Sequence, residues 1–279
     1  MARIAIIGLT GQSLFFKVPH FHAGGETVHA EDFHSELGGK GFNQAVAAAR
    51  QGAEVAFLTA VGADDAARVR GFLAQEGIAG TVIGKAVPSA HAAILTDGSG
   101  ETRVTVFPGA RLDVVDVELF AMAIASADIL LLTNEVPEEV NLRASEIAAA
   151  ASVRVMLNPA PARTLPAALA VRVFLFTPNE FETAGLADVQ GEVVETLGAK
   201  GCRVRSTGEI ISAPRVKAVD STGAGDTFNG VLAVWLAEGE TLAAACAAAN
   251  AAAARSVTVR YVLPAIPCRI SSQTENKTC

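Results

Sequence analysis

The chain has 279 residues, of which 51% are hydrophobic and 18% are charged, and its formal net charge is −7. This composition supplies enough apolar surface for a packed core and excludes a disordered chain. The net negative charge disfavours a general nucleic-acid binder, which normally presents a basic stripe. A chain of this length forms one large α/β domain or two small ones.

Neither the N-terminus nor any internal stretch has the pattern of a targeting or membrane-spanning segment. The apolar run at residues 4–7 is far shorter than a signal-peptide core or a bilayer span. An alanine-rich stretch at 242–254 is interrupted by Asn250 and followed by Arg255. The four cysteines show no CxxC or other metal-ligand spacing, which predicts free thiols in a reducing compartment. We therefore expect a soluble cytoplasmic protein with no membrane partner.

Short apolar runs alternate with helical patterns from the N-terminus onward. In chain order, the expected buried strands are residues 4–7, 55–59, 129–132, 153–157, 174–176 and 193–196. The expected helices are residues 42–50, 66–75, 117–125 and 138–150. The strands are brief, rich in Val, Ile, Leu and Phe, and bounded by Gly, Pro or Asn. This alternation predicts an α/β fold with a mostly parallel sheet and helices on both of its faces.

Two regions break the alternation, at residues 14–33 and 83–107. They contain few helix signals and much apolar–polar alternation, which is typical of half-buried strands. Asp97 and Gly98 separate two such runs and predict a hairpin turn. We interpret the two regions as a small separate β-sheet that forms a lid over the main sheet.

The most informative stretch is the glycine-rich turn at residues 220–230, with the sequence DSTGAGDTFNG, which leads into a helix. The first N–H groups of a helix lack partners within it and carry a partial positive charge, so they attract anions. Gly223 and Gly225 have no Cβ and allow a ligand to approach the backbone. Asp226 beside such an anion site would serve to remove a proton from an attacking hydroxyl. The alternative is that Asp226 only caps the helix after a flexible turn.

Polar residues follow several of the predicted strands, at the sheet edge where ligands bind in parallel α/β folds. These residues are Glu135, Asn158, Asn179, Glu182 and the segment 198–201. Each of them alone is compatible with an ordinary turn, where Asn, Pro and Gly are common. Their shared position at one edge, together with the Asp226 turn, predicts a single site.

A second glycine cluster, GGKGFNQ at residues 38–44, also opens a predicted helix. It is not a Walker A loop, because no Ser or Thr follows the lysine and the upstream glycine spacing is wrong. Lys40 and Asn43 would hydrogen-bond the hydroxyls of a polyol, while the alternative is a turn with an exposed lysine. Gly8 and Gly11 follow the first strand but lack the third glycine of a dinucleotide fingerprint, which disfavours a nicotinamide dehydrogenase.

The two glycine segments, at residues 38–47 and 218–230, resemble the two signatures of the ribokinase-like (PfkB-type) carbohydrate kinases. Five shorter segments are similar to the same family and occur in the right order. They are residues 25–28, 107–110, 157–161, 177–180 and 196–201. The resemblance extends over nearly the whole chain. It implies one kinase domain over residues 1–279, with a Rossmann-type sheet and a small β-sheet lid.

The resemblance implies ATP-dependent phosphorylation of a hydroxyl on a small carbohydrate, ribose or a related sugar. Asp226 would be the catalytic base, and the backbone of Gly223, Ala224 and Gly225 would form the anion hole. The residues implied to hold the sugar are Gly39, Lys40, Asn43 and Glu135. Those implied to line the nucleotide site are Thr196, Gly198, Gly201 and Asn250. Asn179 and Glu182 would organise Mg²⁺ and phosphate through water, and the lid would be the family's β-clasp, which often forms a homodimer interface.

Three features depart from the family's pattern. Ser13 stands at the substrate-binding position where the family usually has an aspartate that binds sugar hydroxyls. The segment 183–195 is too short for the helix and strand normally found there, so we expect a loop and an exposed sheet face near the nucleotide. Tyr261 replaces a glycine of the family's monovalent-cation loop, to which Asp220 and Thr222 would still contribute a K⁺ site.

Two functional hypotheses from different classes follow. The first is a sugar kinase with complete catalytic machinery, which the intact motif at residues 223–226 favours. The alternative is a catalytically impaired kinase-fold protein that binds a sugar or nucleotide as a sensor, which Ser13 and the shortened segment favour.

Overall fold

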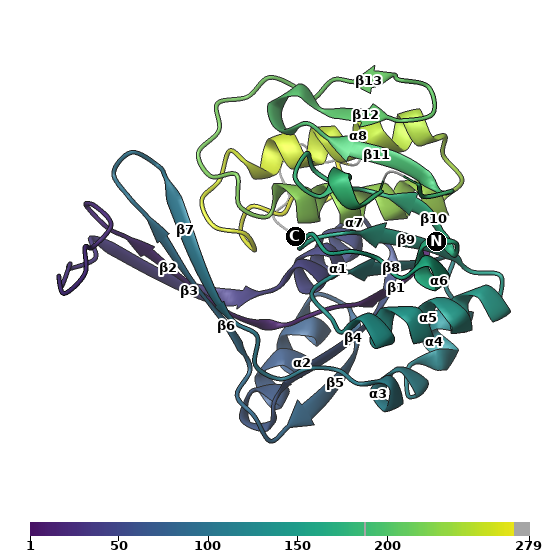
Figure 1. Ribbon diagram of the computed structural model, residues 1–279, viewed down its shortest axis with the longest axis horizontal. Helices are drawn as coiled ribbons and strands as arrows, with labels where there is room; N and C mark the ends of the chain where they lie inside the picture. Colours follow the sequence, from purple (N-terminus) through teal and green to yellow (C-terminus); the bar gives the residue numbers. More distant parts are fainter. Residues whose placement is uncertain (187, 271–279) are drawn as a thin grey trace.

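The residues described by this computed structural model, 1–186 and 188–270, form two β-sheets. A nine-stranded sheet with the order β13-β12-β11-β10-β9-β8-β1-β4-β5 forms the body of the molecule. A four-stranded sheet with the order β3-β2-β6-β7 projects from the body as an arm (Figure 1). The separate sheet expected from the sequence therefore exists.

The main sheet is parallel from β5 to β11, and only β12 and β13 run antiparallel to their neighbours. Its strands are β1 (Arg3–Ile7), β4 (Glu54–Gly62), β5 (Ala79–Lys85), β8 (Ile129–Thr133), β9 (Arg154–Asn158), β10 (Val173–Phe176), β11 (Glu192–Thr196), β12 (Cys202–Val204) and β13 (Ile210–Ile211). All six strands expected from the sequence are among them. The prediction of an α/β fold with a mostly parallel sheet is confirmed.

Helices cover both faces of the main sheet. One buried cluster joins the sheet to α1 (Lys40–Arg50), α2 (Ala66–Gln75), α7 (Ala224–Ala237) and α8 (Leu242–Ser256). A second cluster joins the other face to α3 (Val114–Glu118), α4 (Ala121–Ala125), α5 (Glu138–Ala150) and α6 (Ala167–Ala170). Short 3₁₀ helices are η1 (Ala63–Asp65), η2 (Thr183–Leu186) and η3 (Gly198–Lys200). None of the helices in the described part of the chain combines the length and the apolar character that a bilayer crossing requires.

The prediction of a single helix at residues 117–125 is wrong, because two separate helices, α3 and α4, occupy this region. A reciprocal capping box between Asp113 and Asp116 starts α3 at residue 114, earlier than expected. The chain then turns at Phe120, whose backbone has ψ near 0° and whose side chain is buried in the core. The break at Leu119 and Phe120 separates the two helices.

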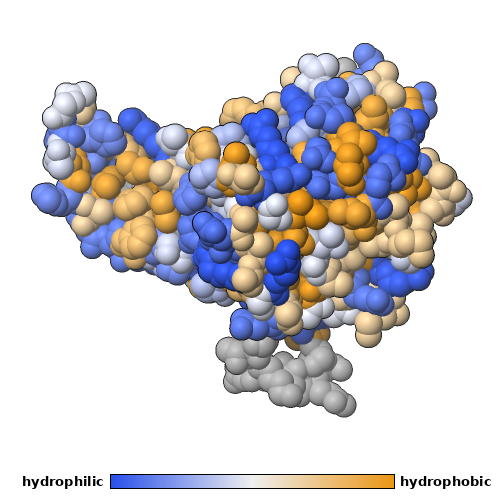
Figure 2. Space-filling view, turned by 90° about the horizontal axis from the view of Figure 1, so that it is seen from below, coloured by the Kyte–Doolittle hydropathy of each residue, from blue (hydrophilic) through white to orange (hydrophobic). Residues whose placement is uncertain are grey.

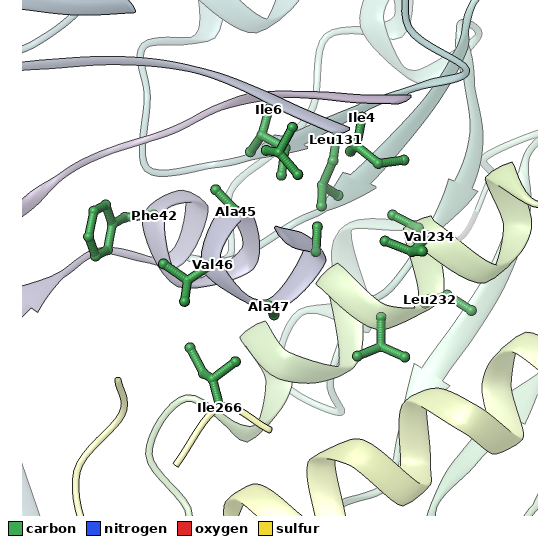
Figure 3. Packing of buried hydrophobic residues seen from close by; sticks show 14 of the residues in the cluster. Ile4, Ile6, Phe42, Ala45, Val46, Ala47, Leu131, Leu232, Val234 and Ile266 are labelled. Atoms are coloured by element: carbon green, nitrogen blue, oxygen red, sulfur yellow. The ribbon is translucent and has the colours of Figure 1, made fainter. Parts of the chain in front are cut away.

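Side chains of β1 alternate between the two faces of the sheet, as the pleat of a strand requires. Ile4 and Ile6 pack in the cluster that contains α1 and α7, which Figure 3 shows from close by. Ala5 and Ile7 pack in the cluster on the other face. All four residues are almost completely buried, so β1 contributes to both layers of the core.

Helices α1 and α7 pack closely in the first of these layers (Figure 3). A Cβ added at Gly230 would lie 2.6 Å from both the Ala47 Cβ and the Gln44 carbonyl oxygen. Asn43 contacts Asp226, and Ala47 contacts Gly230 four residues further along both helices, so the helices run side by side in the same direction. Their N-termini, which carry the two glycine segments, consequently lie together.

The arm consists of β2 (Gly11–Lys17), β3 (Asp32–Gly38), β6 (Ala90–Thr96) and β7 (Thr102–Phe107). Its bounds differ from the expected 14–33 and 83–107, because residues 83–85 continue β5 in register with β4 of the main sheet. The expected hairpin joins β6 and β7, but its turn runs from Asp97 to Glu101 with Gly100 in the left-handed conformation. Val104 and Val106 on β7 are more than half exposed, and apolar surface covers part of the arm in Figure 2.

The shortened segment after β10 contains the 3₁₀ turn η2 and, in its described residues, no α-helix before β11. The expected loop is confirmed, but the expected exposure of the sheet face is wrong. Phe176 and Val193 are fully buried because Leu186 of η2 packs in the same cluster and covers them. A single turn thus replaces the covering function of a longer helix.

The prediction of free thiols is confirmed for two cysteines. Cys202 and Cys246 are free and buried in the layer that contains α8. Cys268 is disulfide-bonded, so the prediction is wrong for this residue.

Replacing Gly230 by alanine should destabilise the protein, because the added methyl group would push against the backbone of α1. Overpacking of this kind costs roughly 1–3 kcal/mol of unfolding free energy, measurable by urea unfolding. The matched control is Gly71→Ala on the exposed side of α2, where the methyl group meets open space and alanine favours the helix by up to about 1 kcal/mol. Equal stabilities of the two variants would contradict the close contact of α1 and α7.

Candidate active site

The turn before α7 holds its backbone in a conformation that only glycine adopts easily. Gly223 has φ of +74°, and a Cβ at this position would lie 2.5 Å from the side chain of Val262. The Thr227 N–H donates to the Gly223 carbonyl at 2.9 Å, which is the first rung of the helix. The N–H of Ala224 donates to Ser221 at 3.3 Å, while those of Gly225 and Asp226 lie too early in α7 for a partner within the helix. This N-terminus is therefore suited to an anion.

The carboxylate of Asp226 is buried in the first turn of α7 and is held by two amides of α1. Asn43 Nδ2 donates to Oδ2 at 2.8 Å, and Gln44 Nε2 donates to Oδ1 at 3.3 Å. Burial raises the pKa of Asp226, while the Lys40 ammonium and the two amides oppose that rise. A carboxylate that is oriented and partly desolvated in this way is suited to accept a proton.

Hydrogen bonds continue from Asp226 across the ends of two strands and return to α7. Gln44 Nε2 also donates to Asn158 Oδ1 at 3.1 Å, and Asn158 Nδ2 donates to the Thr177 carbonyl at 3.1 Å. The Thr177 hydroxyl donates to Asn229 Oδ1 at 2.5 Å, and Asn229 Nδ2 donates to the Gly225 carbonyl at 2.8 Å. The network fixes the turn of α7 to the carboxyl ends of β9 and β10.

The sequence predicts Asn158 at the sheet edge, but it indicates no role for Gln44, Thr177 or Asn229. All four side chains are buried, and buried polar groups are normally hydrogen-bonded. The available signal was their position beside recognised residues, since Gln44 follows Asn43 and Asn229 lies three residues after Asp226 on α7.

Lys40 lies among three carboxylates. The attraction of Asp226 is the main cause that raises the pKa of Lys40, and Glu135 and Glu182 act in the same direction. Glu135 Oε2 also accepts the backbone N–H of Lys40 at 2.7 Å. Burial, reinforced by the charge of Asp226, raises the pKa of Glu135 to about 7. The predicted sugar-binding residues Lys40, Asn43 and Glu135 thus surround the predicted base.

Two cavities meet at the glycine turn. A polar cavity of about 240 Å³ is lined by Lys40, Asn158, Asn179, Glu182 and Asp226, among others. A larger cavity of about 470 Å³ is lined by all four predicted nucleotide residues, Thr196, Gly198, Gly201 and Asn250. Apolar side chains such as Phe228 and Val257 form other parts of its wall. Both cavities share Thr196, Ser221 and Gly225, so the turn separates an acidic compartment from a mainly apolar one.

Asn179 and Glu182 bind each other at the entrance of η2. The backbone N–H and the side-chain amide of Asn179 donate to the two oxygens of Glu182 at 2.9 and 3.0 Å. Within residues 1–186 and 188–270, no group of three His, Cys, Asp or Glu side chains could hold a metal ion by itself. Glu182 and Asp226 nevertheless line the same cavity, and one or two carboxylates together with water and phosphate suit Mg²⁺. The residues present therefore fit a water-mediated Mg²⁺ site.

The predicted residues Ser13 and Gly39 lie at the base of the arm. Gly39 ends the turn before α1 with φ of +118°, and a Cβ there would lie 2.3 Å from the Leu9 carbonyl oxygen. The Ser13 hydroxyl lies against Gly38, so it adjoins this turn without lining either of the two cavities.

The predicted cation residues form a different loop. The N–H of Thr222 donates to Asp220 Oδ1 at 2.9 Å, and the N–H of Tyr261 donates to Asp220 Oδ2 at 3.0 Å. Tyr261 has φ of +66°, a backbone conformation that glycine adopts more easily than tyrosine. All three residues line a third cavity of about 510 Å³ between this loop and the arm.

Comparison with known proteins agrees with this geometry. The family model described as pfkB family carbohydrate kinase matches residues 1–267. The ribokinase of Haemophilus influenzae is 35% identical over 292 residues, and the match covers 95% of each chain. The crystal structure of ribokinase from Thermotoga maritima has a TM-score of 0.86 at 31% identity and covers 96% of this chain and 97% of that one. The ribokinase from Cryptococcus neoformans var. grubii, crystallised in complex with ADP, has a TM-score of 0.82 at 26% identity, with coverages of 96% and 97%.

The free energy of unfolding should fall less steeply with rising pH when Glu135 is replaced by glutamine. The folded state retains the proton of Glu135 up to about pH 7, whereas the unfolded chain releases it near the ordinary value of 4.5. The contribution of Glu135 to the free energy of unfolding is therefore fully present below about pH 4.5. It is lost as the pH rises toward 7, and the loss is on the order of 3 kcal/mol. Urea unfolding between about pH 4 and 8 should therefore show a steeper decline for the unchanged protein than for Glu135→Gln. The control Glu54→Gln, exposed at the start of β4, should follow the unchanged protein, and parallel curves for Glu135→Gln would contradict the assignment.

Proposed function

This chain belongs to the pfkB family of carbohydrate kinases and is a phosphotransferase with an alcohol group as acceptor, and we propose that it transfers the γ-phosphoryl group of ATP to a hydroxyl of ribose or a related small sugar. The observation that carries the proposal is the carboxylate of Asp226, buried beside the open N-terminus of α7 where two cavities meet. Phosphoryl transfer needs a group that orients the nucleophile and donors that stabilise negative charge. This junction supplies both.

Asp226 acts as the general base in this proposal. Asn43 and Gln44 occupy one side of the carboxylate, which leaves the cavity side for the acceptor hydroxyl. Burial raises the pKa of Asp226 and makes the carboxylate a better proton acceptor than an exposed aspartate, while the charge of Lys40 opposes that rise and favours the ionised form. The acceptor sugar would lie between Asp226 and the turn at Gly39, within reach of Lys40, Asn43 and Glu135.

The turn at Gly223, Ala224 and Gly225 acts as the anion hole. Its backbone N–H groups and the dipole of α7 would stabilise the charge on the transferred group. ATP would occupy the cavity of about 470 Å³, whose apolar wall suits a nucleobase. This cavity reaches the turn through the residues that it shares with the polar cavity. The similar Cryptococcus ribokinase was crystallised in complex with ADP, which supports a nucleotide as a ligand of this chain.

Mg²⁺ would be held near Glu182 and Asn179 through water, where it would neutralise phosphate charge. Glu182 and Asp226 both face the polar cavity, so the positive charge would also offset their mutual repulsion. A monovalent cation at Asp220 and Thr222 stays a prediction. A homodimer through the arm also stays a prediction, supported by the exposed apolar side chains of β7.

Replacing Asp226 by asparagine should lower kcat by roughly 10²–10⁴-fold, because the amide cannot accept the proton of the hydroxyl. ADP release should be measured across a panel of pentoses, hexoses and nucleosides. The control Asp64→Asn, exposed in η1, should leave kcat unchanged. Near-normal turnover of Asp226→Asn would remove Asp226 as the base. Absence of turnover by the unchanged protein on every acceptor, with binding retained, would instead favour the sensor.

Replacing Ser13 by aspartate should improve the use of ribose if position 13 reaches the sugar. A hydrogen bond to a charged acceptor contributes about 1.5–3 kcal/mol, so the KM for ribose should fall by roughly 10-fold or more. The KM for ATP should not change, because Ser13 does not line the larger cavity. Ser35→Asp, on the exposed side of the neighbouring strand, is the control. An unchanged KM for ribose would show that residue 13 does not contact the acceptor.

A further inference from the structure

The segment 260–263 lies between the arm and the turn before α7, and its aromatic residue packs on the arm. The ring of Tyr261 stacks on His34, with centroids 3.8 Å apart and planes inclined by 21°. It also meets the edge of Phe15 at 5.5 Å, and its hydroxyl donates to Asp32 Oδ2 at 3.1 Å. Tyr261 therefore contacts both β2 and β3.

Other members of the segment reinforce this contact. The carboxylate of Glu36 is buried and accepts the backbone N–H of Val262 at 2.8 Å. The guanidinium of Arg260 lies 3.5 Å from the carboxylate of Asp32. Asp32, His34 and Glu36 are alternate residues of β3, so these three contacts come from one face of this strand, beside Phe15 of β2.

The same segment holds the turn before α7 from the other side. The backbone N–H of Tyr261 donates to Asp220 Oδ2, and Asp220 Oδ1 accepts the N–H of Thr222. Val262 fills the space above Gly223, where an added Cβ would meet it at 2.5 Å. The backbone of residues 220–223 is thus positioned by residues that are themselves fixed on the arm.

Tyr261 maintains this double contact in an unfavourable backbone conformation. Its φ of +66° lies in the left-handed region, which bulky residues rarely adopt and which persists only where the surroundings enforce it. Among the described residues, only Ser152 shares this property without being glycine, and it follows α5 in a turn at the end of that helix. Glycine would adopt this conformation without strain. For tyrosine, the contacts of the side chain must offset the backbone strain.

We propose that Tyr261 is a positioning residue that fixes the phosphoryl-binding turn at residues 220–225 to strand β3 of the arm. The ring and the N–H belong to one residue, so a shift of β3 against the ring displaces the N–H that holds Asp220. The position of β3 thereby sets the position of the turn at residues 220–225. This inference rests on the proposed function, because it takes the turn as the site of phosphoryl transfer.

Amide hydrogen exchange of the ligand-free protein tests the coupling without any turnover. Tyr261→Asn keeps a residue that tolerates positive φ but removes the ring, and His34→Ala removes its stacking partner. Both variants should raise exchange in peptides covering residues 219–226 by about threefold or more. Ser35→Ala on the same strand and Ser152→Asn at the other left-handed position should leave this exchange unchanged. Unchanged exchange in Tyr261→Asn would overturn the proposal.

Steady-state kinetics then separate positioning from simple loss of structure. With ATP and the best acceptor of the sugar panel, Tyr261→Asn should lower kcat about tenfold, with the KM for ATP within about twofold and little change in thermal stability. Tyr261→Phe keeps the stack and loses only the bond to Asp32, so its kcat should be intermediate. A fall in kcat that merely follows a fall in Tm would overturn the positioning role. If the unchanged protein phosphorylates no acceptor, the proposed function fails, but the exchange experiment still decides whether the arm holds the turn.

Discussion

The close contact of α1 and α7 is the constraint on which the site depends. The two helices run in the same direction and touch at Gly230, where no larger side chain fits. Each begins after a glycine with positive φ, so the contact brings both glycine turns to one end of the sheet. The amides of Asn43 and Gln44 can then replace water around the carboxylate of Asp226. Without this approach, the buried carboxylate would lack the partners that make its burial tolerable.

Carboxylates outnumber cationic side chains around Lys40. Asp226, Glu135 and Glu182 act on a single lysine, Lys40, and part of the surplus is relieved because Glu135 retains its proton up to about pH 7. Asp226 and Glu182 line the polar cavity, and the turn before α7 borders both cavities, so the positive end of the α7 dipole lies beside these carboxylates.

The arm contacts the segment that supports the turn before α7. Its strand β3 presents Asp32, His34 and Glu36 to the segment that also supports Gly223 and Asp220. The departure at Tyr261 therefore fits a consistent structural role, since the ring occupies the junction and the backbone adopts the conformation of a glycine. The shortened segment after β10 is also compensated, because Leu186 covers the sheet face that a longer helix would bury.

The sequence by itself determined the alternation of strands and helices, the existence of the second sheet, and both glycine turns with Lys40, Asn43 and Asp226. These features follow from local periodicity and from the steric freedom of glycine, which neighbouring residues reveal. Only the tertiary structure decided that Gln44 and Asn229 support the site, that β5 leaves the arm for the main sheet, and that Tyr261 joins β3 to the turn. Gln44 and Asp226 are 182 positions apart, and Glu36 and Val262 are 226 apart. Such contacts depend on how the helices and sheets pack, because no local pattern specifies which distant amide will meet a buried carboxylate.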